Sequence, residues 1–310
     1  MSNRKLVITL GDPNSIGPEI VIKALENKSM KNILLVGARD CLLKLKADEY
    51  LENLVEVGAK DFKVQWGKEC EESGRVAYES LEHSVRLLES ERGHVILNAP
   101  VSKKAIEFSV PGFVGHTGFY EALLGDGKEA IMSFCGDRFH LALFTHHVPL
   151  ATVSEIVMKA DLETWFQRCI ELFECQTKQS LSTIILGFNP HAGEQGLLSL
   201  GEDEKIADAV VNLQDKGYDI SGPKPADTFF QEKNLTGDKH CLIIAMQHDQ
   251  GLIPFKMAHF GHGVATTLGL RYPRFTVDHG TAFDLAGKDQ ANPSSMIHSL
   301  ELALKTLDVQ

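Results

Sequence analysis

Short runs of apolar residues recur along the chain and alternate with segments whose apolar positions follow a helical period. The runs are nearly continuous, as in strands that are buried on both faces of a largely parallel sheet. This alternation of strands and helices predicts an α/β architecture. The predicted strands are 5–10, 32–36, 95–97, 140–145, 183–187 and 241–246.

Three helices have clear start signals between or after these strands. Pro18 suits the first turn of a helix that runs to about Asn27. The apolar residues of 161–173 follow the 3.6-residue period, and Asp161 is suited to cap that helix at its N-terminus. Asn292-Pro293 opens a last helix that continues through Leu307. The pattern therefore predicts a mixed α/β chain that ends in a helix.

The length of 310 residues is about twice the ~150 residues of a typical domain, so two domains or one large one are expected. No repeat and no linker rich in proline or serine separates two halves of the chain. A second domain is therefore expected to be inserted through short crossings.

Composition and charge exclude several classes of protein. The net charge of −11 argues against a nonspecific nucleic-acid binder, which usually carries a basic face. No apolar run approaches the ~20 residues of a membrane span, and the run 6–10 is too short for the core of a signal peptide. The six cysteines form no Cys-x-x-Cys pair, which is typical of reduced thiols in a cytoplasmic protein.

Polar and imidazole side chains follow several of the predicted strands. In open α/β sheets, ligands bind beyond the carboxyl ends of the strands. His147, His191 and His248 each follow a predicted strand, and three imidazoles suit zinc or a related metal with positions left open for substrate. The alternative is chance, because the chain has thirteen histidines and the spacing matches no local zinc motif.

A second set of polar residues is suited to bind an anion. His116, Thr117, Lys256 and Arg274 stand in turn-rich stretches, where basic groups and backbone N–H donors bind phosphate. The alternative is ordinary solvated surface charge. The loop 11–19 is neither a dinucleotide fingerprint nor a P-loop.

Six motifs in a fixed order make the chain resemble the 4-hydroxythreonine-4-phosphate dehydrogenase (PdxA) family of vitamin B6 biosynthesis. The resemblance covers about residues 10–293. Residues 279–293 also show a more distant resemblance to the adenosine-binding loop of isocitrate and isopropylmalate dehydrogenases. The motifs are Gly11-Asp12-Pro13 with Ile16-Gly17-Pro18-Glu19, Gly115-His116-Thr117, Asn189-Pro190-His191-Ala192-Gly193-Glu194, Pro225-Ala226-Asp227-Thr228, His248-Asp249-Gln250-Gly251 and Val277-Asp278-His279-Gly280-Thr281-Ala282.

The resemblance implies a two-domain fold of the isocitrate/isopropylmalate dehydrogenase type with a cleft between the domains. One domain would comprise 1–120 and 258–310 with the nucleotide-binding loop. The inserted domain, 121–257, would carry the metal ligands and the dimer contacts. The enzyme would be a homodimer in which one metal-binding histidine comes from the partner chain.

The resemblance also implies a reaction: NAD(P)-dependent oxidation of a secondary alcohol in 4-phosphohydroxy-L-threonine, followed by decarboxylation of the 3-keto acid to 3-amino-2-oxopropyl phosphate. Three imidazoles favour Zn²⁺ or Co²⁺ over Mg²⁺. The implied metal ligands are His147, His191 and His248; the substrate contacts are His116, Thr117, Lys256 and Arg274; and the cofactor contacts are His279, Gly280, Thr281, Asp284 and Asn292.

Asp249 and Asp227 are the candidates for the base that takes the hydroxyl proton. Asp249 is equally suited to orient a metal-binding imidazole.

Two positions depart from the family pattern near the presumed phosphate end. Ala265 stands where the family usually has an asparagine that contacts substrate, and His262 stands where it often has arginine. These departures leave open a sister dehydrogenase for a four-carbon sugar-acid phosphate, such as threonate or erythronate 4-phosphate. A further alternative is a metal-binding homologue without catalysis.

Overall fold

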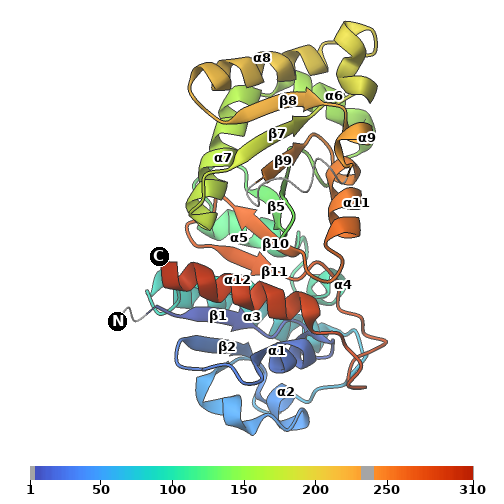
Figure 1. The fold of residues 1–310 in the computed structure, drawn as a ribbon. Coiled ribbons are helices and arrows are strands. Elements are labelled where there is room, and N and C mark those ends of the chain that lie inside the picture. The colour runs from blue at the N-terminus through green and yellow to red at the C-terminus, as the bar shows by residue number, and fades with distance from the viewer. Residues whose placement is uncertain (1–3, 232–240, 310) are drawn as a thin grey trace. The chain divides into compact units, whose positions relative to one another are not determined.

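The computed structural model describes residues 4–231 and 241–309, and they form two compact units (Figure 1). The first unit falls within Met1–Ala130 and Val264–Gln310, and the second within Ile131–Gly263. The second unit is continuous in sequence, and the first is made of the segments before and after it. In the described range, no helix has both the length and the apolar character needed to cross a membrane.

The first unit is built on six strands in the order β3-β2-β1-β4-β11-β10. All neighbouring pairs are parallel except β10 and β11. In chain order the strands are β1 (Leu6–Thr9), β2 (Ile33–Gly37), β3 (Leu54–Glu56), β4 (Val95–Asn98), β10 (Val264–Leu268) and β11 (Arg274–Thr276).

Helices pack on both faces of this sheet, with α12 on one face and α3 on the other (Figure 1). Asn292 accepts a hydrogen bond from the backbone N–H of Ser294 at 2.9 Å, as expected for the start of the last helix. The helices of this unit are α1 (Gly17–Leu25), α2 (Arg39–Lys44), the 3-10 helix η1 (Asp48–Asn53), α3 (Glu71–Glu89), α4 (Lys103–Glu107), α5 (His116–Leu124) and α12 (Ser294–Val309).

The second unit has five strands in the order β5-β6-β9-β7-β8, parallel except for β5 and β6. Asp161 caps α7 as predicted, because its carboxylate accepts from the backbone N–H of Thr164 at 3.1 Å. The elements are β5 (Ile131–Cys135), β6 (His140–Leu143), α6 (Leu150–Lys159), α7 (Leu162–Thr177), β7 (Ser182–Leu186), η2 (Pro190–Gly196), α8 (Glu202–Asp215), β8 (Ile220–Lys224), α9 (Ala226–Phe229), β9 (Cys241–Ala245) and α11 (His248–Ala258).

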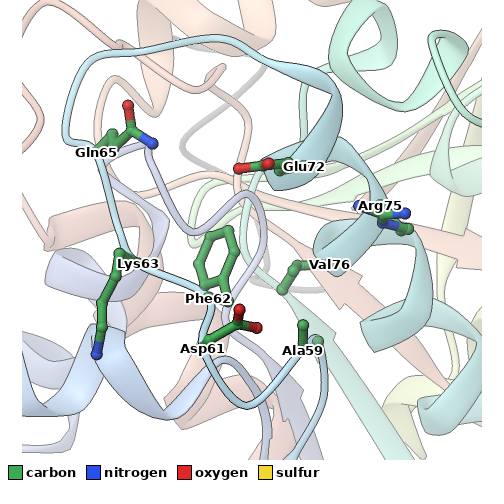
Figure 2. A pocket seen from close by; sticks show the side chains of 9 residues that line it. Ala59, Asp61, Phe62, Lys63, Gln65, Glu72, Arg75 and Val76 are labelled. Carbon is green, nitrogen blue, oxygen red and sulfur yellow. The ribbon is translucent and has the colours of Figure 1, made fainter.

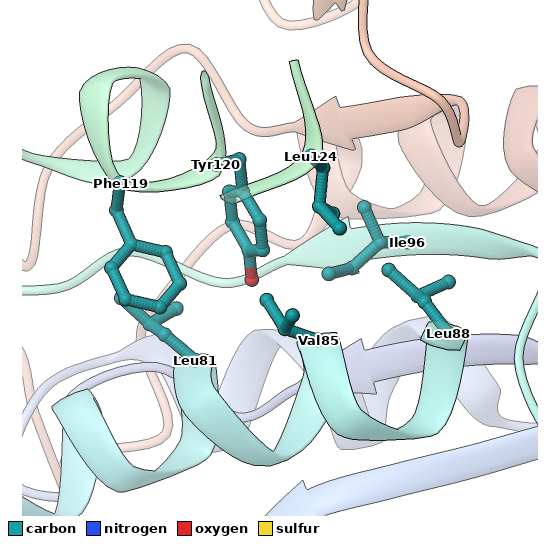
Figure 3. Close-up of a cluster of buried hydrophobic side chains, with 7 residues drawn as sticks. All are labelled: Leu81, Val85, Leu88, Ile96, Phe119, Tyr120 and Leu124. Atoms are coloured by element: carbon teal, nitrogen blue, oxygen red, sulfur yellow. The ribbon is translucent and has the colours of Figure 1, made fainter. Parts of the chain in front are cut away.

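Side chains of α5 belong to the hydrophobic core of the first unit. Phe119, Tyr120 and Leu124 pack on Leu81, Val85 and Leu88 of α3 and on Ile96 of β4, and Figure 3 shows the Tyr120 hydroxyl pointing toward α3. Burying these side chains stabilises α5 on this core. In the second unit, the buried His259 ring lies edge-on to Phe139 and tilted against Phe255.

Candidate active site

Two of the three predicted metal ligands come together in the second unit. β6 and β9 are parallel with Leu143 opposite Ala245, so their carboxyl ends lie side by side. The residues that follow place the rings of His147 and His248 with their centroids 5.9 Å apart. Both line a pocket of about 260 Å³ with Thr145, His146, Val148, Leu150, Val153, Gln247 and Asp249.

Asp249 contacts the neighbouring imidazole directly. Its Oδ1 lies 2.7 Å from Nδ1 of His248, which is a hydrogen bond when that nitrogen carries the proton. This bond leaves Nε2 of His248 as the nitrogen that can bind a metal. Of the two roles considered for Asp249, proton acceptor and residue that orients an imidazole, this contact is the one expected for orienting the imidazole.

His191 lies on an unusual turn of the same unit. It belongs to η2, where the residues from His191 to Gln195 all have positive φ values between 43° and 75°. Such a left-handed run is costly for residues other than glycine. The buried carboxylate of Asp203 holds the approach to this turn by accepting from the backbone N–H groups of Phe188 (2.7 Å) and Asn189 (3.2 Å). The turn leaves the His191 side chain exposed.

Two of the three predicted metal ligands, His147 and His248, lie together in one chain and suit a divalent metal. Two facing imidazoles are suitable ligands for Zn²⁺ or Co²⁺. Across 4–231 and 241–309, however, no three His, Cys, Asp or Glu residues lie close enough together to hold one ion. Of the three predicted ligands, His147 and His248 are the two whose rings lie together.

Two other predicted residues of this unit are exposed. Asp227 lies on the short helix α9, which packs against η2, so it shares a part of the fold with His191. Lys256 lies on α11 with an exposed side chain.

Arg274, in the first unit, is the most unusual charged group of the described chain because its side chain is almost fully buried, at 2% exposure. Its Nε donates to Oδ1 of Asn98 at 2.9 Å, its Nη1 donates to Oγ1 of Thr267 at 2.6 Å, and its guanidinium lies 5.3 Å from the centre of the Tyr120 ring. Burial lowers the pKa of Arg274 to about 10, so it is still charged at neutral pH. Both hydrogen-bond acceptors are neutral, and no carboxylate among the described residues pairs with it.

Asn98 is fixed for this task by a buried network. Its Nδ2 donates to Oγ1 of Thr9 and to the hydroxyl of Tyr120, both at 3.0 Å, and that hydroxyl also lies 2.8 Å from Oγ of Ser84. With its amide nitrogen engaged, Asn98 presents its oxygen to Arg274. Asn98 was not among the predicted site residues. Its position directly after the predicted strand 95–97 is the feature of the sequence that could have identified it.

His116 lies at the start of α5 near the same arginine. Burial lowers the pKa of His116 well below its usual value, and the positive charges of Arg274 and Lys103 lower it further. The imidazole is therefore neutral at pH 7. Its Nε2 is enclosed, with no hydrogen-bond partner among the described residues. Thr117 follows in the first turn of the helix, half-buried. Arg274, His116 and Thr117 thus combine one cation with two neutral side chains that can donate hydrogen bonds, and we call this group of residues the recess.

The predicted nucleotide-binding loop is braced by the motif at residues 11–19. The carbonyl of Thr281 accepts from the backbone N–H of Ile16 at 3.1 Å, and Glu19 accepts from the backbone N–H of Ala291 at 2.9 Å. Nε2 of His279 is enclosed with no partner in the described range, whereas Gly280, Asp284 and Asn292 are exposed. The motif 11–19 therefore supports this loop mechanically.

Asp12, in that same motif, gives a pH-dependent prediction. Burial raises the pKa of Asp12 from 3.8 to about 6, although the carboxylate accepts from the backbone N–H of Asn14 and from Ser73. The folded state then binds the proton more tightly than the unfolded state, so this group makes stability fall as pH rises from about 4 to 6. The ionised form costs about 3 kcal/mol above that range.

We expect Asp12→Asn to remove this cost. The free energy of unfolding of the variant, relative to wild type, should rise by about 2 kcal/mol between pH 4.5 and 7.5, because about 1 kcal/mol of the cost is already present at pH 4.5. Urea denaturation of both proteins at the two pH values measures this difference. A difference that does not change with pH would contradict the assignment.

A larger pocket in the first unit contains none of the predicted site residues. It measures about 340 Å³, and Figure 2 shows side chains of both charges around it. Asp61, Lys63, Glu72 and Arg75 are all exposed at its rim, so water already solvates them. The predicted site residues thus lie elsewhere.

Comparisons with known proteins place the chain in a family. The family described as "Pyridoxal phosphate biosynthetic protein PdxA" matches residues 7–303. A 4-hydroxythreonine-4-phosphate dehydrogenase of Sulfurihydrogenibium sp. is 33% identical and covers 97% of both chains. The chain belongs to the PdxA family. It is therefore an oxidoreductase of the dehydrogenase class, as the sequence motifs predicted, and membership implies a nicotinamide cofactor and a metal.

Other similar proteins bear on the fold and on the substrate. The crystal structure of a 4-hydroxythreonine-4-phosphate dehydrogenase from Klebsiella pneumoniae has a TM-score of 0.82 at 27% identity, covering 98% of this chain and 99% of that one. A β-decarboxylating dehydrogenase from Thermococcus kodakarensis shares the fold, with a TM-score of 0.54 at 16% identity. The match covers 98% of this chain and 84% of that one. The predicted fold class is confirmed. A putative D-threonate 4-phosphate dehydrogenase of Symbiobacterium thermophilum is 30% identical, and the match covers 98% of this chain and 97% of that protein.

Proposed function

We propose that the enzyme oxidises 4-phosphohydroxy-L-threonine with NAD or NADP to a 3-keto acid, which decarboxylates to 3-amino-2-oxopropyl phosphate. The observation that carries this proposal is Arg274, a buried charge with neutral partners only. A buried cation is costly unless an opposite charge compensates it. The phosphate of the substrate supplies that charge, with neutral His116 and Thr117 as further donors.

We assign the metal to His147, His191 and His248, with at least one of these ligands contributed by a second copy of the chain in a homodimer. The absence of a three-ligand cluster in the described part of one chain supports a shared site. Once bound, the metal supplies Lewis-acid catalysis and the nicotinamide accepts the hydride. Zn²⁺ is the metal that this donor set favours, with Co²⁺ next.

The two acidic residues then take different roles. Asp249 holds His248 through Nδ1, which orients that ring. Asp227 is left to accept the hydroxyl proton, and its exposed side chain beside η2 can pass the proton to water. The loop 279–292 would bind the adenosine part of the cofactor, and the six free thiols are consistent with a cytoplasmic enzyme.

The test is the formation of reduced nicotinamide with purified enzyme, Zn²⁺ and either NAD or NADP. We expect turnover with 4-phosphohydroxy-L-threonine and little with the same compound lacking phosphate. Equal rates on both compounds would contradict the role of Arg274. Metal binding without any turnover would favour a homologue that has lost catalysis.

D-threonate 4-phosphate is the second candidate substrate, and Ala265 is the observation that favours it. Ala265 lies on β10 two residues before Thr267, so both side chains face the same side of the strand. Alanine offers no hydrogen bond where the family usually has asparagine. A pocket shaped for a substrate without an amino group could tolerate this loss.

Ala265→Asn distinguishes the two substrates. A hydrogen bond to a charged group contributes roughly 1.5–3 kcal/mol, so we expect kcat/KM on 4-phosphohydroxy-L-threonine to rise about ten- to a hundredfold. The measurement compares this substrate with D-threonate 4-phosphate in both proteins. A loss on the first, combined with strong wild-type activity on the second, would show that the enzyme is the sister dehydrogenase.

A further inference from the structure

Lys103, at the first position of α4, lies against the start of α5. β4, the strand that ends at Asn98, is the element before α4 in the chain, and the short connection 99–102 joins Asn98 to Lys103. Gly115, just before His116, has a φ of 97°, and a Cβ there would lie 2.6 Å from Cε and 3.1 Å from Nζ of Lys103. Glycine thus leaves the space that the lysine side chain occupies.

The charges around Lys103 differ from those of its neighbour. Lys104 pairs with Glu69 at 2.9 Å, whereas in the described range no carboxylate pairs with Lys103. Lys103 is close enough to His116 for its charge to act on that imidazole, as is Arg274. Lys103 and Arg274 therefore both lie near a neutral imidazole whose Nε2 has no partner among the described residues, while Glu69 is engaged by Lys104 and Ser102.

We propose that Lys103 is a specificity-determining residue that makes the anion site select a doubly charged phosphate over a singly charged carboxylate. This inference rests on the proposed function, which assigns the substrate phosphate to the same recess. A phosphate monoester carries about −1.5 to −2 charges near pH 7, and Arg274 alone balances only one of them. The ammonium group of Lys103 balances the second, and its exposed stem lets it adapt to the ligand.

The test compares Lys103→Met with Lys104→Met, two adjacent exposed lysines of which only the first lies beside the recess. Calorimetric titration of the full-length protein with inorganic phosphate and with acetate measures the two charge classes without relying on turnover. We expect Lys103→Met to weaken phosphate binding about ten- to a hundredfold and acetate binding less than threefold. Lys104→Met should leave both unchanged, and Lys103→Arg should restore phosphate binding.

Kinetics provide the second measurement. With the phosphorylated substrate, Lys103→Met should raise KM by a similar factor with little change in kcat, because the lysine binds the ground state and the transition state alike. If wild type and Lys103→Met bind phosphate equally, the role of Lys103 is overturned while the proposed function stands. If the wild-type protein binds no phosphate at all, the anion site and the role of Lys103 are overturned together.

Discussion

Replacing Arg274 with methionine is expected to lower kcat/KM for the phosphorylated substrate about a hundred- to a thousandfold. The guanidinium is held by Asn98 and Thr267 and lies close enough to His116 for its charge to act on that imidazole. Each charge-assisted hydrogen bond to phosphate contributes roughly 1.5–3 kcal/mol, and arginine commonly makes two. Steady-state kinetics with saturating cofactor measures this loss.

The same substitution separates a binding role from a structural one. Methionine has a similar volume and removes a buried charge with which no described carboxylate pairs. This gain offsets the cost of leaving the Asn98 oxygen without its donor, so the stability of the unliganded protein should change little. Arg271→Met is the matched control, because Arg271 is an exposed arginine three residues before Arg274 whose side chain interacts with Glu89 and the Leu123 carbonyl. A large loss of stability in Arg274→Met would instead identify Arg274 as a structural residue.

Removal of the metal is expected to reduce turnover at least about a thousandfold, since Lewis-acid catalysis contributes several kcal/mol to such reactions. Zn²⁺ or Co²⁺ should restore activity to the chelated enzyme. His248→Ala should behave like the metal-free enzyme. His83→Ala should not, because His83 lies on α3 and contacts the Glu79 carbonyl. Full activity of protein shown by elemental analysis to be metal-free would refute the metal's role.

Mixing inactive variants tests whether the metal site is shared. If the ligands come from two chains, co-expressed His191→Ala and His248→Ala subunits should regenerate a fraction of active sites in their heterodimers. Heterodimers that form but remain wholly inactive would show that each site is built within one chain.

The predicted strands were all confirmed, because each has a continuous apolar core. The strands that the sequence pattern missed are short or contain residues that interrupt an apolar run, as in β11 with three residues and β8 with Gly222 and Pro223. Their pairing depends on neighbours distant in sequence. Periodicity within the segment therefore could not predict them.

The sequence predicted some residues of the candidate site but not the positions of others. His147 and His248 could be paired because they follow strands whose ends are aligned. The position of His191 could not be predicted, because its left-handed turn is held by Asp203 from the next helix. Lys103 was missed because only the ion pair of Lys104 with Glu69, visible in the structure, distinguishes two adjacent lysines.

The uncompensated charge of Arg274 also links the lifetime of the enzyme to its metabolite supply. A ligand that binds only the folded protein stabilises it by about 2.7 kcal/mol at a hundred times its Kd. The empty protein, with a cation buried among neutral groups, opens more often and offers more unfolded chain to proteases. A cell rich in phosphorylated substrate would therefore retain more of this enzyme without any change in its synthesis.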